Sequence, residues 1–308
     1  MSGYKLASYQ STGGPRAGLV VDDKLFDAAE LTRNKDYASV LGILQDWRRA
    51  RGALKEAAAR APKSKVKGRP LSRTKLLAPV LYPSAIFCAG ANYADHALEM
   101  STINKRPLEP DPHTLGLESW HFIKASRSLS HPGATIRISD YSKSMDWEAE
   151  LAAVIGRPAK NVPIEKALDY VAGYTAANDL SARDRSRRPH INDTSPFKAD
   201  WVAHKSFDGS CPLGPWITPA SEIRDPQKLG IKLWVNDVLK QDSNTGKMIF
   251  TLAEQIAHLS SRLTLHPGDL VLTGTPAGVG AARKEFLNAG DTVRIWIEKI
   301  GTLENKMA

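Results

Sequence analysis

Residues 145–156, which read MDWEAELAAVIG, constrain the fold more than any other part of this 308-residue chain. The segment is predicted to be a β-strand, and residues two apart in a strand share a face. Glu148 and Glu150 therefore point to one side, while the apolar residues around them point to the other side and require burial. The apolar run over residues 151–155 is typical of a strand inside a hydrophobic core.

Two carboxylates beside a core need an explanation. They repel each other and lose hydration, which costs free energy unless a cation or protons compensate. Ligand sets made only of oxygen suit a hard cation such as Mg²⁺, Mn²⁺ or Ca²⁺. The alternative is an edge strand with a solvated acidic face, and the spacing alone leaves both interpretations open.

The composition is typical of a soluble globular protein, with 42% hydrophobic and 24% charged residues. No apolar run approaches the ~18 residues that span a membrane. The N-terminus lacks the basic segment followed by an apolar one that marks a signal peptide. Cys88 and Cys211 have no metal-ligand spacing, which favours free thiols in a reducing compartment. We therefore expect a cytoplasmic protein with no membrane partner.

The net charge of +9 is concentrated in one segment. From Arg48 to Lys75 there are eleven Lys or Arg residues and one acidic residue, Glu56, so this segment carries +10 and the rest of the chain −1. A nucleic-acid-binding surface has this kind of charge. However, only Trp47 at its edge is aromatic, and no nucleic-acid motif is present. We favour a solvated helix and linker, and keep nucleic-acid binding by residues 48–75 as a remote alternative.

The first quarter of the chain is predicted to form a small α+β domain. Residues 3–9 and 17–21 alternate like short strands, and residues 36–61 show helical periodicity before a basic linker. We therefore predict a small N-terminal domain and linker over residues 1–76 and a catalytic domain over residues 77–308.

A second group of candidate residues follows a short buried strand that ends at Gly90. His96 and Glu99 are three apart and would share a face of a helix. A histidine oriented by a carboxylate is a general-base arrangement, although a surface pair on a helix has the same spacing. Residues 100–118 are rich in proline and polar residues and predict a mobile loop, whose closure would exclude water from the pair.

Further candidates follow the predicted strand 171–177. Asp179 lies at the end of that strand, a common position for a ligand. Arg183 could hold an anionic substrate group, or pair with Asp179 or Asp184 and only shape a turn. The Gly-rich segment 270–280 fits neither the P-loop nor the full dinucleotide pattern, but its backbone amides could bind a carboxylate.

Five motifs, taken in order, resemble those of the fumarylacetoacetate hydrolase superfamily. They are 92–99 (NYADHALE), 146–151 (DWEAEL), 173–184 (GYTAANDLSARD), 205–208 (KSFD) and 267–279 (PGDLVLTGTPAGV). The resemblance covers about residues 80–308, and residues 1–75 resemble the variable N-terminal domain of many bacterial members. It implies a mostly β fold with α elements, a mixed β-sandwich roll that is usually a homodimer.

The resemblance also implies the roles of individual residues. It implies Mg²⁺ or Mn²⁺ held by Glu148, Glu150 and Asp179, catalysis by His96, Glu99 and Lys205, and substrate binding by Arg183, Thr275 and Tyr93. Two departures affect the substrate side of the site. Ser186 stands where many members have glutamine, and the loop 185–204 is several residues longer than in the smallest members.

The implied reaction is hydrolysis of a carbon–carbon bond in a 2,4-diketo acid of the acylpyruvate or fumarylacetoacetate type. The metal would stabilise the departing enolate, and the substrate would be a small-molecule keto acid. Isomerases, decarboxylases and hydratases of related keto or hydroxy-diene acids use the same scaffold, so these activities stay open. The intact His96–Glu99 pair favours a reaction that needs activated water.

Overall fold

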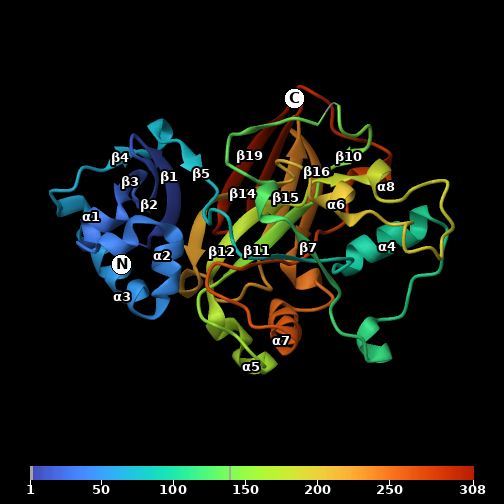
Figure 1. Cartoon of the computed structure of the whole chain (residues 1–308), viewed down its shortest axis with the longest axis horizontal. Coiled ribbons are helices and arrows are strands. Elements are labelled where there is room, and N and C mark those ends of the chain that lie inside the picture. The colour runs from blue at the N-terminus through green and yellow to red at the C-terminus, as the bar shows by residue number, and fades with distance from the viewer. Residues whose placement is uncertain (1–2, 139) are drawn as a thin grey trace.

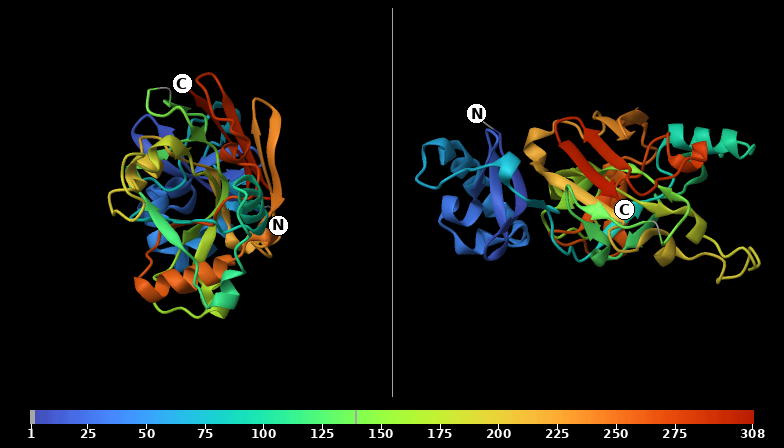
Figure 2. Two further views of the ribbon diagram at one scale, coloured as in Figure 1. Left: turned by 90° about the vertical axis from the view of Figure 1, so that its right-hand side faces the viewer. Right: turned by 90° about the horizontal axis from the view of Figure 1, so that it is seen from above.

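The computed structural model describes residues 3–138 and 140–308, and strands dominate it (Figure 1). The N-terminal segment lies at one end of the molecule, and helix α4 lies at the other (Figures 1 and 2). Within the described residues, no helix is both long and apolar enough to cross a membrane.

The strands are β1 (Lys5–Ser11), β2 (Gly14–Val21), β3 (Lys24–Asp27), β4 (Arg69–Pro70), β5 (Leu76–Leu77), β6 (Ile86–Ala89), β7 (His121–Lys124), β8 (Leu129–Ser130), β9 (Thr135–Ile136), β10 (Met145–Asp146), β11 (Ala149–Ile155), β12 (Val171–Asn178), β13 (Ser181–Ala182), β14 (Cys211–Pro219), β15 (Gly230–Val235), β16 (Val238–Asn244), β17 (Leu270–Leu272), β18 (Thr292–Ile297) and β19 (Gly301–Met307). The α-helices are α1 (Ala28–Thr32), α2 (Val40–Gln45), α3 (Trp47–Arg60), α4 (Ala94–Ile103), α5 (Ile164–Ala167), α6 (Trp201–Lys205), α7 (Leu252–Arg262) and α8 (Gly280–Arg283).

The N-terminal segment contains the predicted strands and helices. Strands β2 and β3 pair across a tight turn at Asp22 and Asp23, whose positive φ values of 47° and 58° suit a two-residue hairpin loop. Helix α3 buries Ala50 and Leu54, while its basic side chains are exposed. The basic side chains of α3 thus lie on the surface, and nucleic-acid binding by this segment stays a remote alternative.

Strand β1 connects this segment to the rest of the molecule. It pairs antiparallel with β14 at Leu6 and Ile217, so the N-terminal strands extend the main sheet. One hydrophobic cluster contains Leu6 and Leu44 together with Val154 and Leu272. The division near residue 77 stays a prediction, because sheet and core both continue across it.

Two large sheets form the body of the structure. The larger has the order β4-β3-β2-β1-β14-β12-β11-β17-β6-β7, and the smaller has the order β16-β15-β18-β19-β9. Both are mixed, because β17 pairs parallel with β6 and β19 pairs parallel with β9. The mostly β fold with mixed sheets is therefore confirmed.

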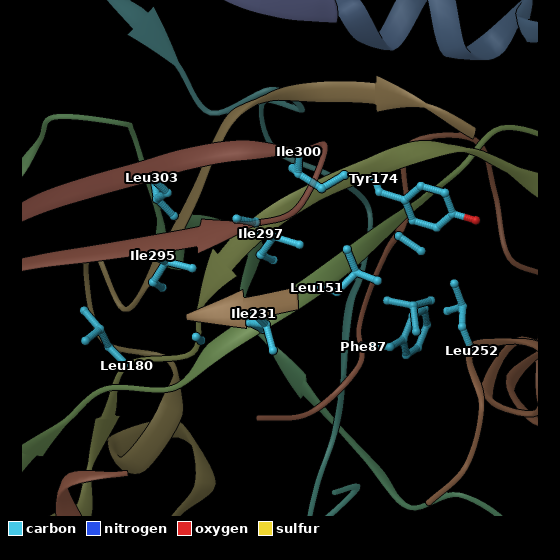
Figure 3. Close-up of a cluster of buried hydrophobic side chains, with 14 of the residues drawn as sticks. Phe87, Leu151, Tyr174, Leu180, Ile231, Leu252, Ile295, Ile297, Ile300 and Leu303 are labelled. Atoms are coloured by element: carbon cyan, nitrogen blue, oxygen red, sulfur yellow. The ribbon is translucent and has the colours of Figure 1, made fainter. Parts of the chain in front are cut away.

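Apolar side chains from the two sheets pack against each other. Leu151 and Tyr174 of the larger sheet belong to the same cluster as Ile231, Ile295 and Ile297 of the smaller one (Figure 3). This core holds β11 and β12 in place, and both strands lead directly into the candidate site.

Residues 145–156 differ in one respect from the single strand that the sequence predicts. Two strands, β10 and β11, replace a single continuous strand, and Trp147 and Glu148 lie between them. The interruption has a local cause: the Asp146 carboxylate accepts the Trp147 amide at 2.8 Å, and the Asn178 side chain accepts the Glu148 amide at 3.0 Å. Side-chain acceptors therefore replace ladder bonds where the acidic residues begin.

Candidate active site

Strands β11 and β12 bring three acidic residues together. The strands are antiparallel with Ala149 opposite Asn178, and the Asp179 amide donates to the Glu148 carbonyl at 2.9 Å. Oxygen atoms of Glu148, Glu150 and Asp179 all lie within 4.8 Å of one another, and all three residues are buried. The structure therefore assembles the three residues that were predicted to be metal ligands.

These carboxylates have unequal environments. Burial raises the pKa of Glu148, but Lys205 and Arg183 outweigh it and hold this pKa well below its usual range. Burial raises the pKa of Glu150 well above its usual range, and the charges of Asp179 and Glu148 raise it further. Within the described residues, Glu148 and Asp179 form ion pairs with basic side chains, whereas Glu150 forms none.

The acidic group fits a hard divalent cation. Its donor atoms are all carboxylate oxygens, the set that Mg²⁺ and Mn²⁺ prefer. The Glu150 Oε2 atom accepts the Gly274 amide at 2.8 Å, whereas its Oε1 atom is buried and has no hydrogen-bond partner in the described structure. A buried oxygen without a partner is costly, and a bound cation would remove that cost.

Two buried lysines contact the acidic group. Lys205 Nζ lies 3.0 Å from Glu148 Oε2 and 2.6 Å from Asp179 Oδ2. Lys124 Nζ lies 2.6 Å from Asp179 Oδ1 and also donates to the Leu180 carbonyl at 3.3 Å. Burial lowers the pKa of Lys205, but Asp179 and Glu148 outweigh it, so the pKa is raised and Lys205 is charged.

Arg183 has different partners from those considered in the sequence. Its Nε atom donates to Asp146 at 2.8 Å and its Nη2 atom donates to Glu148 at 2.5 Å, so the pairing is with neither Asp179 nor Asp184. Asp146 is buried and also accepts the Gly280 and Ala281 amides. The guanidinium therefore fixes the position of Glu148, and its contact with substrate stays a prediction.

Helix α4 carries His96 and Glu99 on one face, as predicted. His96 Nδ1 lies 3.6 Å from Glu99 Oε2, which is too long for a hydrogen bond, and this buried nitrogen has no partner in the described structure. Glu99 instead accepts the Gly278 amide at 2.9 and 3.0 Å. Gly278 lies four residues after Gly274, whose amide binds Glu150, so helix α4 is fixed to the same loop that contacts the acidic group.

Thr275 and Tyr93 lie on the segments that flank the acidic group. Thr275 follows Gly274, whose amide binds Glu150, and its hydroxyl accepts from Gln241 Nε2 at 2.9 Å. Because Gln241 Oε1 accepts the Ala149 amide at 3.0 Å, the orientation of this side-chain amide is defined. Tyr93 is buried, and burial together with the nearby charge of Glu150 raises its pKa.

The long loop before Lys205 has internal structure. Arg187 pairs with Ala199 as a short bridge, and Arg188 Nη2 lies 2.5 Å from Asp200 Oδ2. The loop projects from the body of the molecule (Figure 2). Ser186 donates to the Arg183 carbonyl at 2.7 Å, so it closes the turn after Arg183.

Three buried residues of the site were missed in the sequence. Lys124, Asp146 and Gln241 all contact predicted site residues, but each lies on a different segment. Asp146 had a usable signal, because it lies two residues before Glu148 in the same motif. Lys124 and Gln241 had none, since a single lysine or glutamine in a strand is usually solvated.

Comparison with known proteins gives matches over most of the chain. The family model "Fumarylacetoacetate (FAA) hydrolase C-terminal" matches residues 85–308. A mitochondrial oxaloacetate tautomerase of Xenopus laevis is 43% identical over 236 residues, which are 76% of this chain and 68% of that protein. One of the mitochondrial oxaloacetate tautomerases of Homo sapiens is 38% identical over 240 residues, which are 77% of this chain and 71% of that protein.

Solved structures extend the similarity to nearly the whole chain. Maleylpyruvate hydrolase from Sphingobium sp. SYK-6, in complex with manganese(II) and pyruvate, has a TM-score of 0.75 and 30% identity, covering 99% of this chain and 98% of that one. The 2-hydroxyhepta-2,4-diene-1,7-dioate isomerase from Mycobacterium marinum has a TM-score of 0.71 and 29% identity, with the same coverage. Proteins similar to this chain thus include hydrolases, isomerases and tautomerases.

Proposed function

The chain belongs to the fumarylacetoacetate hydrolase family, and on this premise we propose that it is a metal-dependent enzyme that hydrolyses a carbon–carbon bond in a 2,4-diketo acid. The observation that carries the proposal is the buried group of Glu148, Glu150 and Asp179, with one Glu150 oxygen left without a partner. The similar hydrolase, which was solved in complex with manganese(II) and pyruvate, supports a divalent cation and a 2-keto acid as ligands of this chain.

Glu148, Glu150 and Asp179 are the residues that would hold Mg²⁺ or Mn²⁺. The cation would act as a Lewis acid toward the keto and carboxylate oxygens of the substrate. The chain's own residues then have three tasks, which are to activate water, to stabilise the negative charge on the attacked carbonyl, and to hold the substrate carboxylate.

His96 is the proposed base. Its Nδ1 atom faces Glu99 Oε2 at 3.6 Å, which leaves Nε2 as the nitrogen that would act on water. It would take a proton from water, and the hydroxide would attack the remote carbonyl. The bond between that carbon and its neighbour would break, its electron pair would leave with pyruvate as the enolate, and His96 would return the proton to give pyruvate.

Lys205 and Thr275 are the residues proposed to bind the substrate. The Lys205 ammonium has three N–H donors, of which two contact Glu148 and Asp179, so the third can donate to the developing oxyanion. Thr275 Oγ1 already accepts from Gln241, so its own proton points elsewhere and can bind a carboxylate. The gap of 3.6 Å between His96 and Glu99 would have to close for Glu99 to orient the base.

Oxaloacetate tautomerisation is the second candidate. The relatives that are 43% and 38% identical to this chain carry that name. Tautomerisation moves a proton without adding water, so it needs the metal and one proton carrier but no attacking hydroxide.

A substrate panel tests the proposal. Acylpyruvates and oxaloacetate should be incubated with the protein and Mg²⁺ or Mn²⁺, with pyruvate release and loss of enol absorbance followed separately. We expect pyruvate release from at least one acylpyruvate and its loss in EDTA. Enol loss from oxaloacetate with no pyruvate from any acylpyruvate would replace the hydrolase with the tautomerase.

A further inference from the structure

Three aromatic rings form a partly exposed group near the acidic residues. The ring centroids of Trp120 and Trp201 are 5.3 Å apart, and Phe122 lies 5.8 Å from Trp120 and 5.2 Å from Trp201. Trp120 is 52% exposed and Trp201 is 43% exposed. Large apolar rings that pack on one another and remain open to solvent commonly mark a binding surface.

The register of the main sheet places these rings on the same face as the acidic residues. Reading across the strands, Ala152 pairs with Leu272, Leu272 with Cys88, and Cys88 with Phe122. Directly paired residues share a face, and so do residues two apart on one strand. Glu150 precedes Ala152 by two residues, so Glu150 and Phe122 lie on the same face of the sheet.

Direct contacts join the rings to the charged residues of the site. The Lys205 Nζ atom, which contacts Glu148 and Asp179, lies 5.1 Å from the centre of the Phe122 ring. Phe122 and Lys124 are two residues apart on β7, and Lys124 contacts Asp179. The group of aromatic rings therefore adjoins Lys124 and Lys205, the two lysines that contact the acidic residues.

Trp120 has a defined position over Gly90. A Cβ atom built on Gly90 would lie 2.0 Å from a carbon of the Trp120 ring, so only glycine leaves room for the indole at this place. Gly90 directly follows β6 and precedes the segment that carries Tyr93 and His96. The indole thus rests on the segment that carries other site residues, and its outer face is left to solvent.

We propose that the rings of Trp120, Phe122 and Trp201, together the aromatic platform, bind an apolar or aromatic group at the acyl end of the substrate. This inference rests on the proposed function, because it assumes that the keto-acid end lies at Glu148, Glu150 and Asp179. The substrate class is then a 2,4-diketo acid with an aryl or bulky apolar acyl group. Such a group would cover rings that an acid as small as oxaloacetate leaves in water.

A pair of non-reacting ligands tests the platform without requiring turnover. Pyruvate and phenylpyruvate share the keto-acid end and differ only in the phenyl group. Their dissociation constants should be measured by calorimetry with the Mn²⁺-loaded full-length protein and with Trp120→Ala. Trp120→Phe serves as the conservative variant, and Ile123→Ala as the matched control, because Ile123 is 61% exposed and lies on the opposite face of β7.

We expect the wild type to bind phenylpyruvate more tightly than pyruvate, and Trp120→Ala to weaken phenylpyruvate about tenfold while pyruvate changes less than about twofold. Trp120→Phe should restore part of the preference, and Ile123→Ala should leave both constants unchanged. Equal weakening of both ligands would overturn the inference, as would an unchanged preference for phenylpyruvate in Trp120→Ala.

The proposed function would fail separately. If the protein prefers phenylpyruvate through Trp120 but releases no pyruvate from any acylpyruvate, the aromatic platform is supported and the hydrolase activity is refuted. If it cleaves acylpyruvates with no preference for the acyl group, the hydrolase activity is supported and the aromatic platform is refuted.

Discussion

The acidic group and helix α4 meet at one site but are held in very different ways. Glu148, Glu150 and Asp179 are buried at the ends of paired strands, and two lysines and an arginine contact them. Helix α4, which carries His96, has no buried residue, and it is fixed to the body by hydrogen bonds that Asp95 and Glu99 accept. The buried half of the site, Glu148, Glu150 and Asp179, is therefore part of the core. The attached half, helix α4, is held on the surface of the core by polar contacts.

This difference predicts different functions for the two halves of the site. A buried, cross-linked charge cluster costs little reorganisation when charge develops on a substrate. A surface helix with few apolar contacts opens locally at a low free energy, as lids over active sites commonly do. We therefore expect the buried half to determine binding of metal and keto acid, and α4 to determine whether water reaches the substrate.

The largest effect is expected from a change in the buried half. Glu150→Gln keeps the size of the side chain and removes one ligand charge, so Mn²⁺ binding and all turnover should fall by orders of magnitude. Titration of Mn²⁺ by electron paramagnetic resonance measures the first effect directly. Unchanged Mn²⁺ affinity in this variant, or full turnover of the wild type in EDTA, would contradict the metal assignment.

The same substitution has a predicted pH signature without metal. The pKa of Glu150 is raised in the folded protein, so the fold binds a proton that the unfolded chain releases above its ordinary pKa of 4.5. Stability of the wild type in EDTA should therefore fall as the pH rises above about 4.5, and Glu150→Gln should lack this loss. Melting temperatures measured in EDTA from pH 5 to pH 8 check the difference; parallel curves would refute it.

The second prediction concerns His96 on the attached half. His96→Ala should lower acylpyruvate cleavage by roughly 10² or more, the usual scale of general-base catalysis, while Mn²⁺ affinity stays unchanged. Any decarboxylation of oxaloacetate should fall much less, because it needs the metal but no activated water. Steady-state rates of acylpyruvate cleavage and of oxaloacetate decarboxylation, measured for the wild type and for His96→Ala, show how much each reaction is slowed.

Glu99→Gln is the companion variant. It should act in the same direction as His96→Ala but more weakly, because it changes the orientation of the base and keeps the base itself. If His96→Ala cleaves acylpyruvates at the wild-type rate, His96 and Glu99 have no part in hydrolysis.

The smallest effect is expected at the attachment of α4. Asp95 accepts from Ser243 at 2.6 Å, from Lys247 at 3.2 Å and from the Ala277 amide at 3.3 Å. Asp95→Asn weakens the charged contact, so amide exchange over residues 94–103 should speed up and cleavage should fall only a few-fold. Adding oxalate and Mg²⁺ should slow exchange over residues 92–118; no change on adding them would argue against a lid.

The sequence predicted the buried half better than the attached half, for physical reasons. Alternation along 145–156 correctly grouped Glu148 with Glu150, because strand geometry is local, although it missed the interruption that puts Glu148 just before β11. Lys124 and Gln241 reach the site from other strands, and only the sheet register brings them there. The spacing of His96 and Glu99 predicted a shared helical face, but not that the Gly278 amide would bind the carboxylate.

The central claim is that water attacks the acyl carbonyl beside the acidic group. The most direct test cleaves an acylpyruvate in H₂¹⁸O with the Mn²⁺-loaded protein and records mass spectra of both products. The account predicts pyruvate together with a carboxylic acid that carries one ¹⁸O more than acid from substrate exchanged without enzyme, with His96→Ala slowing its appearance. Loss of the enol form without any labelled acid would contradict the account and leave a tautomerase.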